Sequence, residues 1–233
     1  MTTDAKRPPR KADLARLGRG MTRPILFSAP MVRAILAGTK TQTRRVVKGA
    51  PDDWSPIGPH VYSPTVIDRH GDEQPGPDAF GAGNVDGDCW INCPHGKPGD
   101  RLWVRETWAA PHNCDYLAPR EIDRDWRIHY AATEERGDLR WRPSIHMPRW
   151  ASRITLEVLS VRVERLQDIS EADARAEGAT CVDEVTGREV LFPSVSKCGS
   201  YRLHYRDIWE QINGAGSWNE NPWVWVVEFR RQD

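Results

Sequence analysis

Residues 38–45 bring one amine, three hydroxyls and two guanidiniums together in the run Gly-Thr-Lys-Thr-Gln-Thr-Arg-Arg. Arginine offers a planar fork of donors, lysine a point charge and threonine a small donor and acceptor, so the run suits an anion or the edge of a nucleobase. A desolvated lysine such as Lys40 can lose its proton and activate a nearby hydroxyl such as that of Thr43. Arg44 and Arg45 are candidates for contacting a substrate. The alternative is a solvated basic helix end whose charge complements the helix dipole.

The residues before this run predict a strand followed by a helix. Residues 24–27 read as a short strand, Ser28 can cap a helix, and Pro30 fits its first turn. Gly38 supplies the end of this helix, and the segment 39–47 enters a β-prone stretch. The apolar side chains that share one helical face are Met31, Val32, Ile35 and Leu36. The reactive run is therefore expected where a helix passes into a strand.

A second helix, farther along the chain, places a carboxylate in an unfavourable position. The run Ser-Glu-Ala-Asp at 170–173 matches a capping box, and Gly178 ends the short helix that it begins. Glu177 then lies at the helix C-terminus, where a negative charge meets the negative end of the helix dipole. A carboxylate at such a position needs a further interaction, or a function, to explain it.

The remaining patterns predict an α+β fold around a small barrel. Residues 101–106 and 223–230 alternate as strands do, and residues 205–212 place apolar side chains on one helical face. In the strand near 154–163 the apolar positions change parity. This change predicts a β-bulge near residues 159–160, a device that bends strands into barrels.

Composition divides the chain into a basic arm and one domain. Residues 1–20 form the arm, which is expected to be disordered in isolation. Residues 21–233 are expected to form a single domain with three insertions. The first and longest, about 49–97, is rich in Pro, Gly and Asp and predicts an irregular loop. The other two are expected at about 109–148 and 179–199.

A group of thiols and imidazoles in the first two insertions raises the question of a metal. Cys89, Cys93 and His95 lie close together, and His112 and Cys114 follow. Thiolate and imidazole suit zinc, but the cysteine pair has no second pair at a matching spacing. Free thiols are the favoured interpretation, and no metal site and no cofactor are predicted.

Two further groups of side chains have both a functional and a structural interpretation. His146 and Arg149 are candidates for contacting a base or a phosphate, although His146 also suits a structural hydrogen bond. Trp103 and Trp108 offer rings on which a base stacks, but burial in the core is the favoured interpretation.

The charge balance bounds the kind of partner. The chain of 233 residues has 33 basic and 33 acidic side chains, so its formal net charge is zero. Proteins that hold long duplexes through phosphates are usually basic, so a net charge of zero favours local recognition of a base, a nucleoside or a short strand.

Five cysteines without a secretion signal predict a cytoplasmic protein, and no apolar run is long enough to cross a membrane.

Four segments resemble the ASCH family, a branch of the PUA-like barrels linked to RNA. The segment 24–45 ends in the family's opening motif, Gly-x-Lys-Thr-x-Thr-x-Arg, and 97–104 resembles its next strand. Residues 144–154 and 221–226 resemble the larger members found in phages and prophages. The resemblance spans most of residues 22–230, apart from the insertions, and implies a PUA-like barrel.

The resemblance also implies an activity. Characterised amidohydrolases of this family remove the acetyl group of N4-acetylcytidine with a lysine base, a threonine nucleophile and a glutamate proton donor. Matched position by position, these roles fall on Lys40, Thr43 and Glu177, and the last basic residue of the motif is Arg45. The expected partner is RNA, a nucleoside or a modified base. The alternatives are an RNA-binding module without catalysis and a metal-independent ribonuclease.

Overall fold

The computed structural model describes residues 21–51, 53–84, 87, 89–135, 137–180 and 200–232. The predicted basic arm and most of the third insertion lie outside the described residues. The described part is α+β, with strands predominating over helices, which confirms the predicted class. Among the described helices, none combines the length and the apolar character that a membrane crossing requires.

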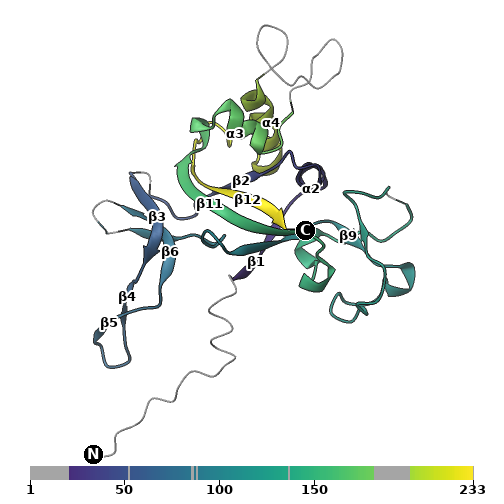
Figure 1. Cartoon of the computed structure of the whole chain (residues 1–233), viewed down its shortest axis with the longest axis horizontal. Coiled ribbons are helices and arrows are strands. Elements are labelled where there is room, and N and C mark those ends of the chain that lie inside the picture. Colours follow the sequence, from purple (N-terminus) through teal and green to yellow (C-terminus); the bar gives the residue numbers. More distant parts are fainter. Residues whose placement is uncertain are drawn as a thin grey trace, which may run out of the picture.

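A five-stranded sheet forms the centre of the molecule (Figure 1). Its strands, in spatial order, are β1 (Thr22–Leu26), β8 (Arg101–Arg105), β11 (Thr155–Arg165), β12 (Trp223–Gln232) and β2 (Gln42–Val46). Strands β1 and β8 run parallel, and the other three pairings are antiparallel. Strands β1 and β2, which precede and follow the first helix in the sequence, are therefore the two edges of this sheet.

In the described part of the chain the sheet does not close into a barrel, because no backbone pairing joins β1 to β2. One side chain spans the two edges instead. Arg45 Nη2 on β2 donates to the carbonyl of Leu26 at the end of β1, at 2.6 Å. Its guanidinium carbon also lies 5.4 Å from the ring centre of Phe27.

The bulge predicted near residues 159–160 is confirmed. The pairing of β11 with β12 shifts register between Val158 and Ser160. Before the shift Leu156 and Val158 pack in the core, and after it Val161 and Val163 pack against the same core. The bulge thus bends β11 so that two opposite parities face one apolar interior.

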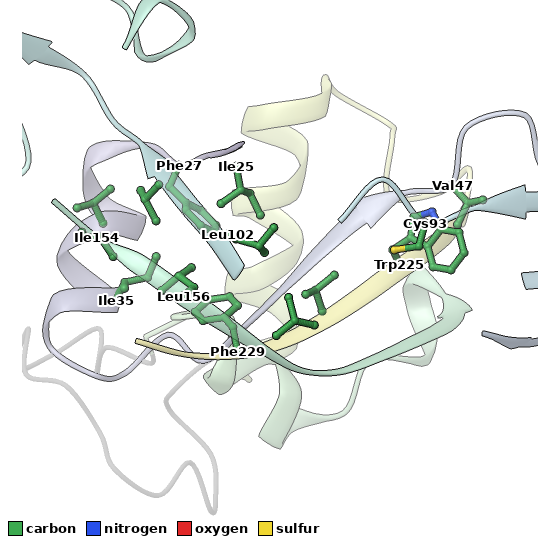
Figure 2. Packing of buried hydrophobic residues seen from close by; sticks show 14 of the residues in the cluster. Ile25, Phe27, Ile35, Val47, Cys93, Leu102, Ile154, Leu156, Trp225 and Phe229 are labelled. Carbon is green, nitrogen blue, oxygen red and sulfur yellow. The ribbon is translucent and has the colours of Figure 1, made fainter. Parts of the chain in front are cut away.

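The main core lies within the curve of the sheet (Figure 2). Phe27 and Phe229 meet there with ring centres 6.1 Å apart. Trp225 lies toward the other end of the cluster, beside Val47 and Cys93. Strands β1, β8, β11 and β12 and the helix after β1 contribute to this core, together with Val47 directly after β2. Its packing therefore fixes the end of this helix, where the reactive run begins.

The three described helices begin and end near the expected residues. Helix α2 (Ala29–Leu36) starts after Ser28, and helix α3 (Glu171–Ala176) starts after Ser170, whose side chain accepts from the Asp173 N–H. Helix α4 (Tyr201–Asn213) covers the other face of the sheet together with α3, around a second apolar cluster.

The prediction that residues 49–97 form an irregular loop is wrong. They contain a three-stranded sheet and a separate hairpin. The sheet joins β3 (Pro56–Tyr62), β6 (Ala79–Asn84) and β7 (Trp90–Asn92), and the hairpin joins β4 (Thr65–Ile67) and β5 (Glu73–Pro75). Several of these strands have only three residues, too few for a two-residue period to be visible.

The second insertion packs around a small core of its own. Trp108, Cys114 and Met147 are buried together there. The strand pair β9 (Trp108–Ala109) and β10 (His129–Tyr130) belongs to this part. Short 3₁₀ turns complete the described structure: η1 (His112–Cys114), η2 (Ser144–His146), η3 (Arg149–Ala151) and η4 (Leu166–Asp168).

Replacing one buried leucine tests the position of the core. Leu156 is fully buried on β11, and Leu156→Ala is expected to destabilise the fold by about 2–5 kcal/mol through lost burial and a residual cavity. Urea denaturation measures the change. Leu159→Ala on the same strand is the matched control, because Leu159 is 48% exposed at the bulge. Equal losses for the two variants would contradict this placement of the core.

Candidate functional site

The backbone itself brings the reactive run to the end of α3. Lys40 and Glu177 form an isolated antiparallel bridge, and the Thr41 N–H donates to the Ala176 carbonyl at 2.8 Å. Gly178 follows with φ of +86°, and a Cβ at this position would lie 3.3 Å from Lys40 Cβ. A glycine therefore permits both the left-handed turn and the close approach of the two segments.

The Lys40 ammonium is buried and bound twice by the same residue. Lys40 Nζ lies 2.7 Å from Glu177 Oε2 and 2.7 Å from the Glu177 carbonyl oxygen, although 137 positions separate the two residues. The side chains are 0% and 2% exposed. Burial lowers the pKa of Lys40 from its ordinary value, and the Glu177 carboxylate opposes this effect.

The second oxygen of the glutamate binds another cation. Glu177 Oε1 accepts from Arg44 Nη1 at 3.3 Å, and Arg44 also pairs with Glu164 and Asp173. Burial alone would raise the pKa of Asp173, but Arg44 and Arg162 outweigh it and lower this pKa. Two cations thus offset the unfavourable interaction of the Glu177 carboxylate with the helix dipole. This explains why a carboxylate is tolerated at the C-terminus of α3.

Thr43 lies in the same small pocket as the carboxylate. It is buried on β2, and with Arg44, Arg45, Glu177 and Tyr205 it lines a hollow of about 60 Å³. In the described structure Lys40 Nζ is not hydrogen-bonded to Thr43. The structure therefore joins the predicted lysine and glutamate directly and brings the threonine into a common pocket with the glutamate.

Sequence reasoning missed Tyr205. This phenol is buried on α4 and lines the small pocket, and the Arg44 guanidinium carbon lies 6.0 Å from its ring centre. Burial, followed by the charge of Glu177, raises the pKa of Tyr205 well above its ordinary value. The apolar face of α4 had indicated only a core position, because periodicity does not distinguish a pocket wall from a core.

A larger cleft of about 560 Å³ adjoins the small pocket, with Arg45, Val46 and Asn213 lining both. Its polar lining also includes Lys48, Asn92 and His95. Burial, then the nearby guanidiniums of Arg45 and Arg23, lower the pKa of His95 to about 4. This imidazole is neutral near pH 7 and supplies a donor or an acceptor without a charge.

His146 and Arg149 are not brought to either hollow. His146 is exposed on η2, and Arg149 Nη2 lies 3.5 Å from Thr155 Oγ1 with its guanidinium over the ring of Trp103. Trp103 and Trp108 are buried, which confirms the core interpretation of both rings. The described site therefore draws on β2, α3 and α4 and on the first insertion.

The candidate metal residues are divided between different cores. Cys93 packs in the main core, where burial raises the pKa of its thiol to about 11, and Cys114 packs in the core of the second insertion. Among the residues that the structure describes, no three metal-binding side chains of the His, Cys, Asp or Glu type come together.

Another hollow, of about 850 Å³, lies beside α2 and α3 and is lined in part by Lys40 and Gln42. Its acidic residues Asp173 and Glu228 are both paired with Arg162. Thr43 and Glu177 line the smaller pocket and not this one. The reactive run is therefore divided between two hollows: Lys40 and Gln42 line the 850 Å³ hollow, and Thr43, Arg44 and Arg45 line the small pocket.

Comparisons of the chain with protein-family models, with curated proteins and with solved structures found no match. The resemblance to the ASCH family therefore depends on the sequence motifs alone.

A double-mutant cycle tests the buried ion pair. Lys40→Met leaves Glu177 buried with one partner fewer and is expected to cost about 3–5 kcal/mol of stability. Combining it with Glu177→Leu should cost clearly less than the two single changes added together, because neither charge remains unpaired. Urea denaturation measures all variants, with the exposed Lys48→Met as control. Strict additivity would contradict the pairing.

The burial of His95 predicts a pH dependence of stability. Between pH 6.5 and about 4 the unfolded chain binds more protons than the folded chain, so stability falls as the pH falls through this window. His95→Gln should remove roughly 2 kcal/mol of that dependence when unfolding is compared at pH 7 and pH 4.5. His70→Gln, at an exposed histidine, should keep the wild-type dependence; equal pH profiles for wild type and His95→Gln would be inconsistent with a buried neutral imidazole.

Proposed function

We propose that this chain is an ASCH-type hydrolase, with its sheet related to the PUA-like barrel, that cleaves the N-acyl bond of an acylated cytidine-type nucleoside. The observation that carries the proposal is the buried contact of 2.7 Å between Lys40 and Glu177, of which Glu177 lines the same pocket as Thr43. An amine, a hydroxyl and a carboxyl group are the set that acyl transfer requires. The cytoplasm, rich in RNA, is the proposed location.

The ion pair supplies the base and the acid together. Transfer of one proton across the hydrogen bond converts the ammonium and carboxylate into a neutral amine and a neutral carboxyl group. Burial of Lys40 favours its neutral amine, because desolvation penalises the ammonium charge. Lys40 is then the base, and Glu177 is the proton donor.

The first half of the reaction forms an acyl-enzyme. Lys40 Nζ takes the proton of the Thr43 hydroxyl, and the threonine oxygen attacks the acyl carbonyl carbon. The bond from this carbon to the exocyclic nitrogen breaks, and Glu177 gives its proton to the departing amine. The products of this half are cytidine, an ester on Thr43, an ammonium and a carboxylate.

The second half returns the enzyme to its starting state. The Glu177 carboxylate takes a proton from water, and the hydroxide attacks the ester carbonyl. The ester bond breaks, and the Lys40 ammonium returns a proton to the threonine oxygen. The acyl group leaves as a carboxylic acid, and the amine and carboxyl group are neutral again.

The sizes of the two hollows suit the two parts of such a substrate. A water molecule occupies about 30 Å³ of liquid, so the small pocket of about 60 Å³ suits an acetyl group rather than a base. The adjoining cleft of about 560 Å³ is within the usual range for small-molecule sites and suits the base and ribose. Arg45 lines both, which supports its proposed role in orienting the substrate.

Incubation with N4-acetylcytidine, followed by detection of cytidine and acetate, is the direct test. Thr43→Val keeps the shape of the side chain but lacks the nucleophile, and it should lower the rate at least about a hundredfold. Acid quenching of the wild type should reveal an acetyl group on Thr43 by mass spectrometry. Thr41→Val, at an exposed neighbouring threonine, is the matched control and should retain the wild-type rate.

A non-catalytic RNA-binding module is the second candidate, and one observation favours it. Both carboxylate oxygens of Glu177 already accept hydrogen bonds, from Lys40 and from Arg44, which suits a rigid structural pair. Binding of single-stranded RNA that Arg45→Ala abolishes, without any product from N4-acetylcytidine, would favour this candidate. Shortening of a labelled RNA in the presence of a chelator would instead favour the ribonuclease alternative.

A further inference from the structure

On one sheet of the first insertion, two aromatic side chains pack against a third. The ring centres of Tyr62 and Trp90 lie 3.8 Å apart, and those of His60 and Trp90 lie 4.8 Å apart. His60 and Tyr62 are on β3, and Trp90 is on β7, with β6 between these strands. We refer to His60, Tyr62 and Trp90 as the aromatic platform.

The platform lies on the face of this sheet that turns away from the main core. Ala82 on β6 and Ile91 on β7 belong to the main core or pack against it. Trp90 and Asn92 have the opposite parity on β7, so they lie on the outer face. His60 is exposed, and Tyr62 and Trp90 are half-buried. The rings are therefore available to a ligand, at least in part.

Two glycines hold the indole against the backbone of β6. A Cβ at Gly83 would lie 2.2 Å from Trp90 Cε3, and a Cβ at Gly81 would lie 2.9 Å from Trp90 Nε1. Glycine weakens a strand interior, and its presence there marks a close approach of another group. Trp90 Nε1 has no hydrogen-bond partner among the described residues. The strand is thus adapted to the indole rather than to its own stability.

The platform is connected to the cleft of the proposed site. The Tyr62 hydroxyl donates to Asn92 Oδ1 at 2.7 Å, and Asn92 lines the cleft together with Arg45 and Lys48. In the described part of the chain no acidic side chain lines this cleft, and neither Arg45 nor Lys48 forms an ion pair. Two cations without an ion-pair contact, beside partly exposed rings, complement a phosphate next to a base.

We infer that the first insertion is a binding site for single-stranded RNA, with bases stacked on the aromatic platform and the intervening phosphate held by Lys48 and Arg45. The inference rests on the proposed function and extends it: the acylated cytidine is a residue of an RNA strand rather than a free nucleoside. A stacking platform with a few cations is the arrangement by which proteins hold single strands. The formal net charge of zero agrees with a short contact of this kind.

The inference is tested by measuring, with fluorescence anisotropy, the binding of a labelled single-stranded RNA of about ten nucleotides. Tyr62→Ala and His60→Ala should each weaken binding about five- to a hundredfold, the usual effect of removing a stacking ring. Their matched controls are Tyr116→Ala and His70→Ala, at exposed rings outside the platform, which should bind as the wild type does.

The phosphate contact has a separate readout. Lys48→Ala should weaken binding and lower the slope of log affinity against log salt by about 0.7, the value for one phosphate of a single strand. Lys97→Ala, at another exposed lysine, is the control. A fully paired RNA duplex should bind more weakly than the single strand, because its bases are not free to stack.

Each outcome decides one of the two proposals. If RNA binds equally to the platform variants and to their controls, or does not bind while N4-acetylcytidine is hydrolysed, the inference is wrong and the proposed hydrolase stands. If RNA binding depends on the platform but no acyl bond is cleaved, the hydrolase is wrong and the RNA site stands. Thermal unfolding of each variant shows whether a loss of binding reflects misfolding instead; if Tyr62→Ala unfolds, His60→Ala and Lys48→Ala still decide the question.

Discussion

The buried contact between the Lys40 ammonium and the Glu177 carboxylate is the interaction on which the rest of the site depends. Isolated charges are costly inside a protein, so each of these two groups requires the other. Their backbones also pair, which fixes the end of α3 against the start of β2. Position and charge are therefore coupled: the contact that joins two distant segments also keeps both buried charges paired.

The same pair is the end of a wider network of charges. Arg44 connects Glu177 to Glu164 and Asp173, and Arg162 continues the network to Glu228. These residues come from β2, β11, α3 and β12. The network lies between the helices and the outer face of the sheet, whereas Arg45, one residue further on, points to the opposite face and reaches β1. The alternation of β2 thus separates a structural arginine from one that faces the cleft.

The first insertion changes the interpretation of the site, because it supplies one wall of the cleft. Asn92 and His95 line the cleft on the side opposite the residues of β2 and α4. The main core includes Cys93 from the insertion, so this wall is anchored rather than merely adjacent. An enzyme for free nucleosides has little need of an additional sheet with exposed rings, which is why we connect the insertion with a longer ligand.

Local features were predictable from the sequence: the two helix starts, the bulge near 159–160, the Lys-x-x-Thr pair and the anomalous Glu177. These depend on residues within one turn or one strand of each other, where propensity and periodicity act directly. Only the tertiary structure decided that Lys40 meets Glu177, that Tyr205 lines the pocket and that residues 49–97 form a sheet. The physical reason is that these outcomes depend on contacts between segments far apart in the sequence. The glycines of β6, for example, are typical of a loop in the sequence alone, and only the packed position of the Trp90 indole explains them in a strand.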